Sequence, residues 1–400
     1  MPPILLRLDA VLRRFFIPLA LLGWGIGVLL AFWAAGFPGR GVFLDYNLNA
    51  WVMSWQEFGW LRRGLVGSLL HPWFEAVGRS TGAVRWTMIA LDGACALGLA
   101  FTARAALRAL EGAGAPRLAA VLRFGLIVSP VGFVQVGWDV GRYDHVLFLL
   151  LAGMAAALLR GRALAAGLTW ALAALVHEGA LFLFAPAALF AFERGRAVAG
   201  RAAAQAALLA PPALAAGALL LLSAQPTDAE IAALWPHLAN YDSAWDRPLV
   251  VLPLHLRWWE VLPALVYAAA PYMLAAKVAR GAGMAPRDLL MPLAMSAPLY
   301  ALGWDWLRWG QLGFAAMIAL LALAVLDRRR AGQGVEDAGE AGGRGAGEAG
   351  GPGAPADLPA GGGLGAWWPY LLPLGPLGVA RALPPLALLV QALTGWQAPI

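Results

Sequence analysis

Long apolar runs alternate with short polar clusters along most of this chain. Several runs reach the roughly 17 to 25 residues with which a helix crosses about 30 Å of hydrocarbon. They are rich in alanine and leucine and lack the two-residue alternation of a membrane β-barrel strand. The pattern predicts an all-α, polytopic transmembrane helix bundle with about 10 to 12 spans. The candidate spans are about 15–36, 83–103, 119–136, 145–159, 163–176, 179–192, 199–223, 261–279, 288–303 and 310–326.

Residues 163–192 allow two interpretations. They form either one long tilted helix or two short helices that meet at His177-Glu178. Two helices suit the arginines better, because Arg162 and Arg194, at the outer ends of the two helices, then fall on the same side of the membrane. The arginines and the single lysine of that side predict a cytoplasmic N-terminus. They are Arg104, Arg108, Arg117, Arg160, Arg162, Arg194, Arg196, Arg201, Lys277, Arg280, Arg287 and Arg328 to Arg330.

Composition agrees with a membrane protein. The 400 residues are 61% hydrophobic and 13% charged, and the mean hydropathy is +0.68. The net charge of +6 would suggest nucleic acid in a soluble protein, but these arginines lie in short loops, so no nucleic-acid partner is expected. Cys95 is the only cysteine, which excludes an internal disulfide and a cysteine zinc cluster. The first apolar run is too long for a signal peptide and is kept as a span.

The chain divides into three regions. Residues 1–330 form the transmembrane domain, with external loops at 37–80 and 224–260. Residues 331–363 are rich in glycine and alanine and predict a disordered cytoplasmic linker. Residues 364–400 are apolar but broken by prolines, so one kinked span and a hairpin within the bilayer are both open.

A short motif, Gly-Trp-Asp-x-x-Arg, occurs twice at the end of an apolar run. It places Asp139 beside Arg142 and Asp305 beside Arg308, and acids and arginines at this spacing share a helix face. A structural ion pair is one interpretation. The first copy is followed at once by Asp144 and His145, more charge than one pair needs, which favours a ligand. The flanking sequences do not align, so two helix ends using one local device are at least as plausible as an internal repeat.

Three other clusters carry candidate chemistry. Arg62 and Arg63 precede glycines and suit a phosphate group, although anchoring at the membrane interface would explain this loop as well. Asp45, if it is more than a solvated acid, is a general base or a ligand of a divalent cation such as Mg²⁺ or Mn²⁺. His177 and Glu178 stand between apolar runs, where ionisable residues mark function by default, and a buried structural pair is the alternative. No zinc-protease HExxH motif is present.

These residues and the predicted topology resemble bacterial membrane glycosyltransferases of the GT-C-like and polysaccharide-polymerase type. The resemblance implies a multi-pass protein of the inner membrane that transfers a sugar or glycan from a polyprenyl-phosphate-linked donor to a glycan or lipid acceptor. It implies Asp45 as base or metal ligand, with His177 and Glu178 binding the acceptor or relaying its proton. The implied donor-binding residues are Arg62, Arg63, Asp139, Arg142, Asp144, Asp305 and Arg308.

A transporter or flippase for an anionic lipid or solute is the competing class. It would use the same arginines for binding and the two Asp-x-x-Arg motifs as gating pairs. A structural membrane subunit is the third possibility.

Overall fold

The computed structural model is helical, and its described residues contain no strand, which confirms the all-α class for them. The structure describes residues 3–35, 51–128, 132–224, 226–235, 284–299 and 306–341, with isolated residues between 269 and 279. Its helices are α1 (Pro3–Arg14), α2 (Phe16–Ala35), α4 (Trp55–Phe58), α5 (Gly64–Val77), α6 (Thr81–Gly112), α7 (Pro116–Val128), α8 (Phe133–Trp138), α9 (Asp144–Leu159), α10 (Ala163–Val176), α11 (Ala180–Leu183), α12 (Ala185–Glu193), α13 (Ala202–Leu222), α14 (Asp228–Leu234), α16 (Arg287–Ala294) and α18 (Trp306–Ala341).

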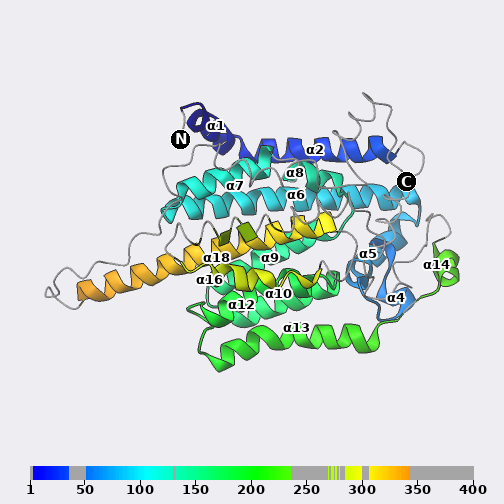
Figure 1. Cartoon of the computed structure of the whole chain (residues 1–400). Coiled ribbons are helices and arrows are strands. Elements are labelled where there is room, and N and C mark those ends of the chain that lie inside the picture. Colours follow the sequence, from blue (N-terminus) through cyan, green and yellow to red (C-terminus); the bar gives the residue numbers. More distant parts are fainter. Residues whose placement is uncertain are drawn as a thin grey trace.

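The long helices lie side by side in one bundle (Figure 1). Helix α2 runs along one edge and α13 along the other, with α6, α9 and α10 between them. The edge helices expose large apolar side chains: Leu29 of α2 is 71% exposed, and Leu214 and Leu221 of α13 are 74% and 83% exposed. Apolar surface of this extent suits hydrocarbon better than water.

Two of the described helices, α6 and α13, are long and apolar enough to cross a membrane. Residues Arg7–Arg14 and Phe16–Phe32 form a third span if the two helices are counted together across their 81° bend. Shorter apolar helices occupy Asp144–Leu159, Ala163–Val176 and Ala180–Glu193. The larger number of spans expected from the sequence remains a prediction.

The break at His177-Glu178 is confirmed. Helix α10 ends at Val176, and His177 takes an extended backbone conformation. The expected span at 179–192 is itself divided into α11 and α12, because Pro186 in the first turn of α12 cannot continue a preceding helix. Residues 119–136 likewise hold two helices, α7 and α8, and the sequence has Pro130 between them.

The first part of the expected linker is helical in the structure, and the linker's bounds remain a prediction. Helix α18 continues to Ala341, so residues 331–341 are helical rather than disordered. Extending an existing helix costs far less than nucleating one, and alanine, glutamine and glutamate in this stretch favour extension. The rest of the linker, residues 364–400 and most of the loop at 224–260 lie outside the described residues.

Helices α2 and α8 approach each other so closely that only glycine fits between their backbones. A Cβ atom on Gly137 would lie 1.9 Å from the carbonyl oxygen of Trp24, and one on Gly27 would lie 2.0 Å from that of Val134. Small residues at such spacing are a common packing device of membrane helices. The first glycine of the Gly-Trp-Asp-x-x-Arg motif is therefore required for packing.

Two ends of the bundle carry different polar networks. At one end Arg123, 2% exposed, forms ion pairs with Asp9 of α1 and Glu111 of α6. Arg194 pairs with Asp288 at 2.7 Å near the end of α12. The short helices α4, α5 and α14 gather at the opposite end of the bundle (Figure 1).

We predict that Gly137→Ala lowers the free energy of unfolding by about 1 to 3 kcal/mol, because the added methyl group forces α2 and α8 apart. Thermal unfolding of the detergent-purified chain measures the change. Gly25→Ala is the matched control, since nothing lies within 4 Å of its Cβ position. Equal unfolding temperatures for the two variants would contradict the packing role.

Candidate functional site

Arg63 and Glu178 form an ion pair that joins the short helices to the end of the bundle. Arg63 Nε donates to Glu178 Oε2 at 2.9 Å and to Oε1 at 3.1 Å, and Nη2 also contacts Oε1. Both side chains are about one-fifth exposed, at 20% and 21%. The two residues are 115 positions apart. Their contact brings together two clusters that the sequence presents separately.

The backbone of Arg63 is unusual. Its φ of 62° and ψ of 8° lie in the left-handed region, and it is the sole non-glycine residue with positive φ among those the structure describes. A side chain in this region costs free energy and persists where surrounding contacts hold it. Arg63 immediately precedes α5, so this conformation turns the chain into the helix while the guanidinium reaches Glu178.

The pair lies in a positive environment. Burial raises the pKa of Glu178, but the charges of Arg63, His177 and Arg62 outweigh that effect and lower the pKa below its ordinary value. His177 Nδ1 accepts a hydrogen bond from the Gly179 backbone at 3.0 Å and lies 3.7 Å from Glu178 Oε2. The structure thus places four predicted residues, Arg62, Arg63, His177 and Glu178, within mutual electrostatic reach.

The glycines after Arg63 have a packing role instead of the expected one of opening the backbone to a ligand. A Cβ on Gly64 would lie 2.5 Å from the Trp55 ring, and one on Gly67 would lie 2.1 Å from the Met53 carbonyl oxygen. Protein atoms already fill these spaces. The phosphate prediction therefore depends on the arginine side chains alone.

The first Asp-x-x-Arg motif forms a local ion pair, but in the turn between α8 and α9 and not on the helix face that the spacing predicts. Arg142 Nε lies 3.4 Å from Asp139 Oδ1, and Gln135 donates to Asp139 Oδ2 at 2.7 Å. Gly141 has a φ of 86°, and its carbonyl oxygen accepts a hydrogen bond from Trp51 at 2.5 Å. The motif is thereby tied to the segment that leads into α4.

A buried pair between α6 and α9 was missed in the sequence analysis. Asp92 contacts His145 Nδ1 and accepts a hydrogen bond from Trp24 Nε1 at 2.8 Å. Asp92 and His145 are 2% and 1% exposed, and His145 Nε2 is buried with no hydrogen-bond partner among the described residues. The signal was present: an acid inside an apolar run marks function in a membrane.

Tyr143 connects the two parts of the site. Its ring lies 5.6 Å from that of Trp51, on the segment that leads into α4, and Asp144 and His145 follow it at the start of α9. On the other side, Asp139 and Asp144 both act electrostatically on His145. Arg63-Glu178 and Asp92-His145 are therefore neighbouring networks within one polar region, and Asp144, 1% exposed, belongs to it.

The remaining predicted residues cannot be placed beside this region. Asp45 and Asp305 lie outside the described residues. Arg308 belongs to the first turn of α18, but its side chain lies outside the described part. The second copy of the motif therefore remains a prediction.

Comparisons with protein-family models, with curated proteins and with solved structures found no match to this chain.

We predict that Glu178→Gln lowers the unfolding temperature at neutral pH, because Arg63 loses its charged partner. The folded-state pKa of Glu178 is lowered, so the pair stabilises the fold above the ordinary pKa of 4.5 and is lost as pH falls through the folded value. The difference between wild type and variant should therefore shrink in acid. Thermal unfolding at pH 7 and below pH 4.5 tests this, and a difference that is constant across this range would contradict it.

Proposed function

We propose that this protein is a multi-pass glycosyltransferase of the bacterial inner membrane. It transfers a sugar or glycan from a polyprenyl-phosphate-linked donor to a glycan or lipid acceptor at the outer face. The observation that carries the proposal is the contact of Arg63 with Glu178, which gathers cations and titratable groups at one end of an apolar bundle. A lipid-linked donor presents its phosphate at that depth, where membrane and water meet.

The orientation has support from the opposite end of the bundle. Arg194 at the end of α12 and the basic residues after Ala324 of α18 lie there, as expected for cytoplasmic helix ends. In the proposed topology of about 10 to 12 spans, the N-terminus is cytoplasmic. The region around Arg63 then forms a polar cavity that faces outward.

In the proposed reaction, the donor phosphate replaces Glu178 as the partner of Arg63. Arginine binds phosphate oxygens through two parallel N–H groups, as it binds a carboxylate. Arg62 and Arg142 add positive charge, and we assign the same role to Arg308 from the repeat of the motif in the sequence. These arginines stabilise the negative charge that develops on the leaving phosphate.

The carboxylate of Glu178, once released from Arg63, can then accept a proton from the acceptor hydroxyl. An acceptor hydroxyl oxygen bonds to the anomeric carbon, and the bond from that carbon to the donor phosphate oxygen breaks. The hydroxyl proton passes to Glu178 or His177, with Asp45 as the alternative base, and the polyprenyl phosphate or pyrophosphate leaves with the bonding electron pair. Asp139, Asp144 and Asp305 orient the arginines and the sugar hydroxyls. A divalent cation such as Mg²⁺ or Mn²⁺ at Asp45 remains part of the proposal.

A transporter or flippase is the second candidate, and the Asp92-His145 pair favours it. Buried acid and histidine pairs within spanning helices are typical of proton relays. In this alternative, the pairs Arg63-Glu178 and Asp139-Arg142 exchange partners as a gate, and no covalent bond changes.

We predict that Arg63→Lys reduces transfer at least tenfold, because an ammonium group cannot reproduce the two-point contact of a guanidinium. The assay measures polyprenyl phosphate or pyrophosphate release from a polyprenyl-linked sugar donor by the full chain in lipid nanodiscs. Arg160→Lys is the control, since Arg160 is exposed at the far end of α9. No release with any acceptor would end the enzyme proposal, and donor movement across vesicles without release would establish the transporter.

The proposed topology predicts opposite labelling of two engineered cysteines. After Cys95→Ala removes the natural thiol, Gln56→Cys should react with an impermeant maleimide added outside the cell, because Gln56 is exposed beside Arg63's helix. Arg160→Cys should react only after the membrane is opened. The reverse pattern would contradict the orientation.

A further inference from the structure

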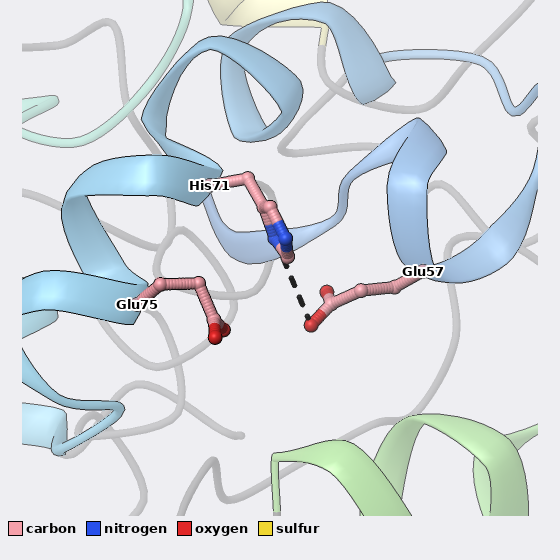
Figure 2. Close-up of side chains that lie close together, drawn as sticks. All are labelled: Glu57, His71 and Glu75. Carbon is pink, nitrogen blue, oxygen red and sulfur yellow. Dashed lines mark ion pairs between the residues drawn. The ribbon is translucent and has the colours of Figure 1, made fainter.

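Three side chains of α4 and α5 converge on one point outside the site described above. Glu57 comes from α4, and His71 and Glu75 come from one face of α5, four positions apart. Figure 2 shows the imidazole and both carboxylates pointing toward one another. Each offers one ligand atom, and these atoms lie within 4.8 Å of one another. Groups of this kind, an imidazole with two carboxylates, bind divalent transition metals.

Glu57 is held in place for such a role. Its Oε2 atom accepts hydrogen bonds from Ser54 Oγ at 3.1 Å and from Trp235 Nε1 at 3.2 Å. Its Oε1 atom is buried and lies 3.9 Å from His71 Nδ1 and 2.5 Å from the guanidinium of Arg79. One oxygen is thus fixed by partners outside the cluster while the other points into it. Outer partners that orient a ligand are typical of metal sites.

The distances between the ligand atoms of Glu57, His71 and Glu75 are near those found around a bound metal ion. His71 Nδ1 lies 3.9 Å from Glu57 Oε1, too far for a hydrogen bond. A tetrahedral ion with bonds of about 2.1 Å holds neighbouring ligand atoms about 3.4 Å apart. The 3.9 Å pair would have to close by about 0.5 Å, and no pair of ligand atoms by more than about 1.4 Å, which side-chain rotations supply.

Arg79 supplies the positive charge in the structure as it stands. Its guanidinium pairs with Glu75, and Nη1 lies 2.5 Å from Glu57 Oε1. The same guanidinium lies 5.0 Å from the centre of the Trp235 ring, a surface that attracts cations. Arg79 therefore has a second contact that it keeps if it leaves the carboxylates.

We propose that Glu57, His71 and Glu75 bind one divalent transition-metal ion of the zinc class, in exchange with the guanidinium of Arg79. The imidazole ligand selects against Mg²⁺, which takes oxygen ligands. A bound ion joins α4 to α5 and stabilises the helix that Arg63 begins. The site does not depend on the proposed transfer reaction, because none of its residues takes part in that reaction.

Zinc titration of the full, chelator-stripped chain in detergent tests the proposal by calorimetry. We expect one saturable site, weakened at least about tenfold by His71→Ala and by Glu75→Gln. Arg79→Ala should bind zinc more tightly than wild type, because the competing cation is gone. Glu230→Gln, an exposed acid on α14 outside the cluster, should leave the affinity unchanged.

The opposing outcomes are equally clear. Absence of saturable zinc binding in both wild type and Arg79→Ala would overturn the site. Unchanged affinity in His71→Ala would assign the zinc to other residues. Equal affinity in wild type and Arg79→Ala would refute the exchange with the guanidinium. Zinc should also raise the unfolding temperature of wild type but not of His71→Ala, a readout that separates metal binding from a folding defect of the variant.

Discussion

The ion pair of Arg63 and Glu178 holds the polar end of this molecule together. Arg63 adopts a left-handed backbone conformation at the start of α5, and its guanidinium reaches the break between α10 and α11. The contact ties α5 to the end of α10 with charge as well as with packing. The position of Glu178 in turn depends on the extended conformation of His177, which separates the two apolar helices. The left-handed backbone of Arg63 and the helix break at His177 are therefore both needed for the ion pair with Glu178.

Close packing of α2 against α8 positions the charged residues of the first Asp-x-x-Arg motif. Gly27 and Gly137 bring α2 and α8 into backbone contact, and that contact positions the loop with Asp139 and Arg142. Gly141 continues the same loop with a positive φ that favours glycine. Within the motif, Gly137 allows the helix contact, and Asp139 and Arg142 form the ion pair. Its glycines explain why the charged residues are held beside the bundle end instead of extending into solvent.

Local features were predictable from the sequence, whereas long-range contacts were not. The apolar run between flanking charges predicted α10 at its observed bounds, and the adjacent His177 and Glu178 predicted the break. The pairing of Arg63 with Glu178 joins residues 115 positions apart, and no local pattern specifies such a partner. Asp92 was passed over because a single acid hardly changes the hydropathy of a long run. Its importance appears only when α9 brings His145 beside it.

The central claim is that the region around Arg63 and Glu178 receives the phosphate of a membrane lipid. Photo-crosslinking tests it most directly, with a polyprenyl phosphate that carries a photoreactive group next to the phosphate and with peptide mapping by mass spectrometry. The account predicts adducts in the first turn of α5 and at residues 177–179, and their loss in Arg63→Ala. Adducts confined to the exposed apolar faces of α2 and α13 would contradict it.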